Sequence, residues 1–128
     1  MAALTQYGVG TGLQDMGLIA NGGGFTWVNN ITAHAGGSQP SAVPLTAAMN
    51  RITVVGTAGD SVALPSAVGG QAITVINASA TSLNVFSSNA STADTINGTA
   101  GTTAYALAGG KTADFMSFPG AWHAILSA

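Results

Sequence analysis

The sequence contains no cysteine, no glutamate and few charged residues of any kind. The absence of cysteine excludes a disulfide framework and thiolate metal sites. Charged residues make up 5% of the chain, against roughly 25% in an ordinary soluble domain. The formal net charge is -2, with Arg51 and Lys111 as the only Arg and Lys. Because binding to nucleic acid depends on several such side chains neutralising phosphates, the composition argues against nucleic acid as a partner.

Long apolar runs are also missing. Every residue between Asp15 and Arg51 is uncharged, but glycines, prolines and paired asparagines interrupt this region. No run approaches the ~20 apolar residues of a membrane-spanning helix. Residues 1–10 lack the basic and apolar regions of a secretory signal. We therefore expect a soluble protein that is synthesised in a cytoplasm and binds no membrane.

What the chain does contain is glycine, 18 residues in 128, together with many Ser, Thr, Asn and Ala. The length suits one compact domain with a single core. A surface with so little charge tends to associate, and the simplest explanation is that association is the native condition. We therefore expect an oligomer or a larger assembly.

The composition and the pattern of apolar residues change near residue 50. Residues 1–50 are Gly-rich and irregular, and we expect an N-terminal arm and loop region here, partly extended, with possible edge strands. Residues 51–128 consist of short β-branched or aromatic runs bounded by Gly, Asn, Asp and Pro, which predicts a β-sandwich domain. The predicted fold class is all-β, a small antiparallel β-sandwich or barrel that is jelly-roll-like. The predicted strands are Arg51–Val55, Ser61–Leu64, Gln71–Asn77, Ser82–Phe86, Thr102–Leu107, Lys111–Phe118 and Ala121–Leu126, and a helical turn is conceivable only within Thr46–Asn50.

Two segments resemble one another within the chain. "AGDSVALPSAVGGQAITV" and "AGTTAYALAGGKTADF" both run from Ala-Gly through a strand to Gly-Gly and a new strand. We interpret them as two similar hairpins, with Gly70 and Gly110 supplying the positive φ of a tight reversal. Two hairpins do not make a solenoid, so the repeat is weak.

Few residues are able to perform acid–base or metal chemistry, and they are not spaced along the sequence as metal ligands are. We expect structural roles for all of them: His34, His123, Asp60, Asp94 and Asp114. On the last strand, Trp122 and His123 must point to opposite faces. No nucleophile motif is present, and Gly22-Gly23-Gly24 lacks the lysine of a phosphate-binding loop. We predict no catalytic residue, no metal and no cofactor.

The aromatic residues allow two interpretations. They could form a platform that stacks on sugars, or they could be anchors of the core and of interfaces, which we favour. They are Tyr7, Phe25, Trp27, Tyr105, Phe118 and Trp122. The four Asn-x-Ser/Thr sequons, at Asn30, Asn77, Asn89 and Asn97, are what chance produces in so polar a chain.

Several segments in order carry a resemblance to a known family. They are G-D-x-V-x-L-P at Gly59–Pro65, G-Q-x-I-T-V-x-N at Gly70–Asn77, D-T-I-N-G at Asp94–Gly98 and W-x-A at Trp122–Ala124. From about Ile52 to Ile125 the chain resembles small β-domains of tailed-bacteriophage virion proteins, most of all capsid decoration (cement) proteins and head-fibre modules. The first third has no counterpart in the resemblance.

The resemblance implies a homotrimer on the outer surface of a phage head, where it would contact the major capsid protein and stabilise the capsid without catalysis. The alternative is a receptor- or glycan-binding fibre or baseplate module of the virion. In either case we expect the irregular N-terminal region to dock on a partner. The interface candidates are Leu18, Ile19, Phe25, Trp27 and Val28.

Overall fold

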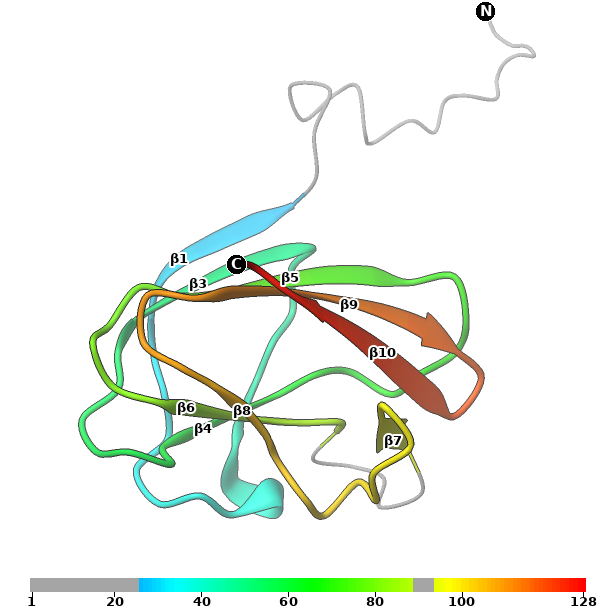
Figure 1. Ribbon diagram of the computed structural model, residues 1–128, viewed down its shortest axis with the longest axis horizontal. Coiled ribbons are helices and arrows are strands. Elements are labelled where there is room, and N and C mark those ends of the chain that lie inside the picture. The colour runs from blue at the N-terminus through cyan, green and yellow to red at the C-terminus, as the bar shows by residue number, and fades with distance from the viewer. Residues whose placement is uncertain (1–25, 89–93) are drawn as a thin grey trace, which may run out of the picture.

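The computed structural model describes residues 26–88 and 94–128, and these residues form two β-sheets that face one another (Figure 1). They contain no α-helix, which confirms the all-β prediction. The larger sheet has the strand order β1 (Trp27–Thr32), β3 (Met49–Val54), β5 (Ala72–Asn77), β9 (Thr112–Phe118), β10 (Ala121–Leu126) and β7 (Thr95–Ile96). The smaller sheet has the order β2 (Val43–Pro44), β4 (Ser61–Ala63), β6 (Leu83–Phe86) and β8 (Tyr105–Leu107). A single turn of 3-10 helix, η2 (Gln39–Ser41), precedes β2.

The chain winds from one sheet to the other with every strand from β1 to β6. The odd-numbered strands of this series pair in parallel in the larger sheet, and the even-numbered strands pair in parallel in the smaller one. Such winding is that of a short β-solenoid, in which each coil contributes one strand to each sheet. The prediction of an antiparallel sandwich or barrel is therefore wrong for these strands.

The two similar sequence segments are corners of this winding rather than hairpins. Gly69-Gly70 lies between β4 and β5, and Gly109-Gly110 lies between β8 and β9, so each pair leads the chain from the smaller sheet to the larger. Gly70 and Gly110 have φ of 75° and 76°, respectively. The positive φ was predicted correctly, but it turns the chain between sheets instead of reversing it within one. The weak repeat is thus part of a solenoid after all.

Antiparallel pairing closes one end of the winding. β8 pairs antiparallel with β6, β9 with β5, and β10 with β9. The only hairpin among the strands just named is β9–β10, where Pro119-Gly120 separates the paired residues Phe118 and Ala121. Proline followed by glycine at φ 76° fits a type II turn.

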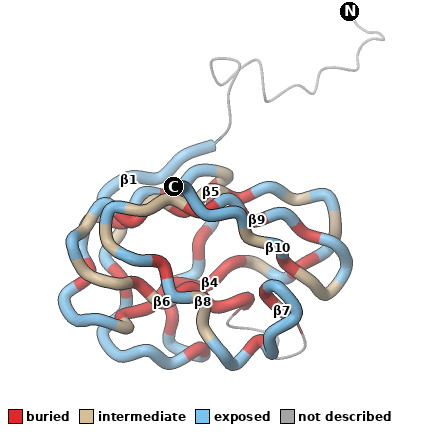
Figure 2. The backbone as a smooth tube through the Cα atoms, in the orientation of Figure 1, coloured by how far each residue is buried: buried red, intermediate tan, exposed pale blue. Residues whose placement is uncertain are grey.

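The hydrophobic core lies between the two sheets, where Figure 2 shows the buried positions. Along β9, Ala113, Phe115 and Ser117 point inward and alternate with exposed or half-buried residues. Trp122 on β10 is fully buried and His123 is exposed, which confirms their predicted opposition. Other large core side chains come from both sheets: Ile52, Val75, Val62, Leu64, Leu83, Val85 and Leu107.

Strand positions were predicted better than strand partners. Each of the seven predicted strands overlaps an observed strand. The conceivable helical turn at Thr46–Asn50 is wrong, because Met49 and Asn50 begin β3. β1 and β2 lie in the region where possible edge strands were expected, and each is at an edge of its sheet, whereas β7 was not predicted as a strand. The boundary expected between residues 50 and 51 falls inside β3, and Ala33, Leu45 and Ala47 upstream of it are buried. Residues 26–50 therefore share the core of the residues that follow.

Candidate interaction surface

The side of the larger sheet that points away from the core carries most of the exposed apolar side chains. One row runs straight across it through paired positions: Trp27, Met49, Thr74, Asp114 and Ile125. A second row contains Arg51, Ile76 and Thr112, and a third contains Ala72, Met116 and His123. We call this surface the outer face and define it by these residues together with Phe118.

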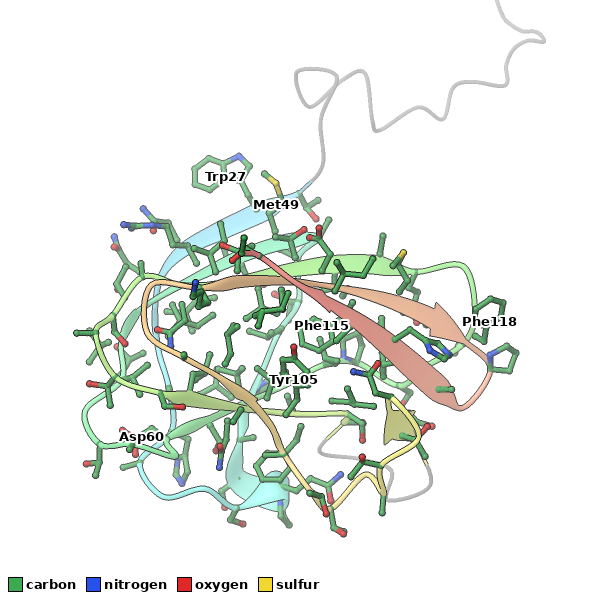
Figure 3. All side chains as sticks on the ribbon, viewed as in Figure 1. Trp27, Met49, Asp60, Tyr105, Phe115 and Phe118 are labelled. Atoms are coloured by element: carbon green, nitrogen blue, oxygen red, sulfur yellow. The ribbon has the colours of Figure 1, made fainter. Side chains whose placement is uncertain are left out.

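The large apolar side chains of the outer face are well exposed. The exposed fractions are 70% for Trp27, 66% for Phe118, 59% for Ile125, 40% for Met49 and 39% for Met116. Figure 3 shows Trp27 and Met49 projecting from neighbouring strands on the side of the sheet away from the core, and Phe118 at the β9–β10 end. Thr74 and Asp114 separate these apolar side chains into one group on β1 and β3 and another on β9 and β10. Exposed apolar side chains gathered on one side of a sheet are candidates for an interaction site.

Formal charge on the outer face is limited to one cation and one carboxylate among the described residues. Arg51 lies on β3 and Asp114 on β9, with β5 between these strands. Arg51 Nη1 donates a hydrogen bond to Asn29 Oδ1 at 3.0 Å, and Thr74 Oγ1 donates one to Asp114 Oδ1 at 2.7 Å. Both charged groups are exposed, so a partner can reach them.

A shallow groove lies at the β1 edge of the outer face and has a volume of about 210 Å³. The apolar side chains of Trp27, Met49 and Ile76 line it together with Arg51 and Asn29, and Val28 and Asn50 complete the lining. An apolar floor with a few polar groups is the usual composition of a binding site, although this volume is below the ~300 Å³ typical of small-molecule pockets. The groove suits one side chain or one sugar ring.

The five residues able to perform acid–base chemistry do not gather at one site, although His34 lies near Asp60. No group of three or more His, Asp, Glu or Cys that could hold a metal ion occurs within residues 26–88 and 94–128. Asp94 Oδ2 accepts a hydrogen bond from the N–H of Ala67, and Asp114 is engaged with Thr74. His123 contacts the ring of Phe118 edge to face, with centroids 5.7 Å apart.

Asp60 organises a loop. It is buried, and its carboxylate accepts hydrogen bonds from the N–H groups of Thr57 at 3.0 Å and Gly36 at 3.1 Å. These bonds, the one from Thr57 first, lower the pKa of Asp60 below its ordinary value, while burial opposes them and His34 contributes least. His34 itself forms a backbone bridge to Ser61. This arrangement ties the β1–β2 connection to the start of β4.

Of the five interface candidates, Trp27 and Val28 lie on β1, at the open edge of the larger sheet, and both are exposed. Leu18, Ile19 and Phe25 lie outside the described residues. Sequence reasoning missed Met49, Met116 and Ile125. The signal for the last two was present, because alternation from the inward Phe115 and Trp122 places Met116 and Ile125 outward.

The aromatic residues that the structure describes do not form one platform. Trp122 is buried, Tyr105 is half-buried against Phe115, and Trp27 and Phe118 lie on different strands of the outer face. Tyr7 and Phe25 lie outside the described residues. Among the sequons, Asn77 is buried, Asn30 and Asn97 have positive φ, and Asn89 is not described.

No protein-family model matches the chain, and no significantly similar curated protein or solved structure was found. In the part of the chain that the structure describes, no helix is long and apolar enough to cross a membrane.

Proposed function

We propose that this protein is a non-enzymatic structural component of a tailed-phage virion, which binds the outer surface of the head as an oligomer and stabilises it. The observation that carries the proposal is the outer face, where five large apolar side chains are exposed around one cation and one carboxylate. A partner can cover such a face with little loss of charge solvation. The resemblance of residues 52–125 to virion β-domains directs the proposal to phage heads.

Stabilisation would follow from linkage. A protein that binds the assembled lattice, and not its separate subunits, shifts the equilibrium away from disassembly. In this role the major capsid protein is the partner and the capsid surface is the location. Because Trp27 lies at the open edge of the larger sheet, we propose Trp27 and Val28 as parts of the capsid contact.

A second function is favoured by the groove beside Trp27. An exposed indole ring next to the guanidinium of Arg51 and the amide of Asn29 offers stacking and hydrogen bonding to a sugar. The protein would then be a glycan- or receptor-binding module of a fibre or baseplate. Absence of catalysis is part of both proposals.

Mass spectrometry of separated heads and tails tests the location, and co-sedimentation of purified protein with heads that lack it tests binding. We expect the protein in heads and co-sedimentation with them. Trp27→Ala should fold and bind heads at least tenfold more weakly, since truncating an aromatic anchor commonly costs about 2 kcal/mol or more. Recovery in tails only, with Trp27-dependent binding on a glycan array, would instead support the fibre function.

The N-terminal arm prediction now concerns residues 1–25 only, since residues 26–50 share the domain core. A variant without residues 1–20 should fold and lose affinity for heads. If it does not fold, or if it binds heads as tightly as the full chain, the arm hypothesis is wrong.

A further inference from the structure

The arrangement of the two charges on the outer face points to a specific partner. Arg51 on β3 and Asp114 on β9 stand on the two sides of β5. Neighbouring strands are about 4.8 Å apart, so the two residues flank the middle strand at roughly equal distances. Between them β5 presents only Ala72, Thr74 and Ile76 outward, none of which carries a charge. The face is thus positive on one side of β5 and negative on the other.

This pattern is self-complementary. A two-fold rotation about an axis that lies along β5, in the plane of contact, exchanges the two sides of the sheet. It brings Arg51 of one copy over β9 of the other, opposite Thr112 and one outward row from Asp114, and does so twice. The two residues differ by one outward row along the strands, about 6.6 Å, a step that a long Arg side chain can cover. We propose that the outer face binds a second copy of this chain, sheet against sheet, with reciprocal Arg51–Asp114 pairs.

The same two-fold rotation also pairs apolar side chains across the contact. Trp27 and Ile125 occupy one row on β1 and β10, each two strands from β5. The rotation therefore places Trp27 over Ile125 of the second copy, so that the two most exposed apolar ends of this row cover one another. Like charges do not meet, because Arg51 and Asp114 are the only formal charges on the described part of the face.

The size of the face sets the expected strength. With the axis on β5, the five strands from β1 to β10 face one another, while β7 has no counterpart. Five strands span about 19 Å and six residues of strand about 20 Å, so two copies would cover about 800 Å² in total. That area is below the range of stable specific interfaces, and we expect weak association, in the upper micromolar range. The homotrimer implied by the sequence resemblance would need a different contact, since a two-fold interface closes at two copies.

Because the outer face also carries the proposed capsid contact, the dimer is the form free in solution and must separate before this face binds a head. The dimer is tested without a capsid, so either proposal can fail alone. Light scattering after size-exclusion chromatography of the full chain, across micromolar concentrations, should give a mass of twice 12.5 kDa. Arg51→Asp and Asp114→Arg should each return the monomer mass, because like charges would then face one another. The double variant with both changes should regain the dimer.

Three comparisons complete the test. Ala106→Asp adds a negative charge at an exposed position of β8, in the smaller sheet and away from the outer face, and it should leave the dimer intact. Trp27→Ala should weaken association about tenfold or more. Circular dichroism should show the same β spectrum for all variants, because the changed residues are not buried. A monomeric or trimeric wild type, a double variant that stays monomeric, or an Ala106 variant that dissociates would overturn the proposal.

Discussion

Tyr105 on β8 and Phe115 on β9 meet edge to face across the core, with ring centroids 5.5 Å apart and planes at 81°. Because β8 belongs to the smaller sheet and β9 to the larger, this contact joins the two sheets directly (Figure 3). The chain between the two strands makes the Gly109-Gly110 corner. The corner and the aromatic pair are thus two links between the sheets at the antiparallel end of the winding.

Phe115 offers a matched comparison with Phe118 on the same strand. Phe115 is fully buried and Phe118 is 66% exposed. We expect Phe115→Ala to lower the free energy of unfolding by about 3–5 kcal/mol and Phe118→Ala to change it by about 0.5 kcal/mol or less. Urea denaturation measures both values. Similar losses in the two variants would mean that the inward and outward sides of β9 have been assigned incorrectly.

Replacing Gly109 or Gly110 by alanine should lower stability by different amounts, although the two glycines are adjacent. A Cβ on Gly109 would lie 2.4 Å from the backbone carbon of Ala80, whereas a Cβ on Gly110 would meet nothing within 4 Å. Gly110→Ala should cost about 1–2 kcal/mol, the penalty of a side chain at positive φ. Gly109→Ala should cost more, about 3 kcal/mol, because backbone must move. Thermal melting of both variants should give this order, and the reverse order would contradict the corner geometry.

Asn77 is expected to be the most costly asparagine to remove. Its buried Nδ2 donates to the carbonyl oxygens of Thr81 at 2.8 Å and Leu107 at 2.9 Å, and its Oδ1 accepts from Ser79. Asn77→Ala leaves these groups unpaired and should cost about 2–3 kcal/mol. The exposed Asn29→Ala, which loses one bond from Arg51, should cost about 0.5 kcal/mol or less. Equal losses in chemical denaturation would show that the Asn77 network does not stabilise the fold.

Asp60 should make stability depend on pH in the acid range. Its folded-state pKa lies below its ordinary value of 3.8, chiefly through the hydrogen bond from Thr57. The stabilisation is therefore complete above the unfolded-state pKa and is lost as the pH falls below about 4 and through the folded-state pKa. Melting temperatures should converge between wild type and Asp60→Asn as the pH is lowered. Asp114→Asn serves as an exposed control, and a constant gap between wild type and Asp60→Asn at all pH values would contradict the prediction.

Local patterns were enough to place most strands and to divide their residues between two faces. In β9 and β10 backbone alternation puts Phe115 and Met116 on opposite faces, and likewise Trp122 and His123. Which face is inward was not evident, because Ser117 is buried and Phe118 is exposed. β1 was harder to predict, because Asn30 has φ of 57° and a register irregularity lies beside it, which interrupts the alternation. β2 and β7 have two residues each, too few to show a period.

The candidate site was predictable only in part. Trp27 and Val28 stood out as apolar residues in a region without a clear pattern, and both are exposed on an edge strand. That Arg51 and Asp114 share the outer face with Trp27 could not be inferred, because strands distant in sequence bring them together. Gly-Gly between two strands was also ambiguous, since the same local conformation serves a hairpin and a corner between sheets.

The sequence by itself determined the all-β class, the low surface charge and which residues of β9 and β10 share a face, because these depend on composition and on backbone alternation over a few residues. Only the tertiary structure decided that the strands wind in parallel between two sheets and that β9 and β10 complete the larger one. Pairing depends on contacts between residues far apart in the chain, which local alternation does not encode. That long-range pairing aligned Trp27, Met49, Thr74, Asp114 and Ile125 in one row and created the outer face.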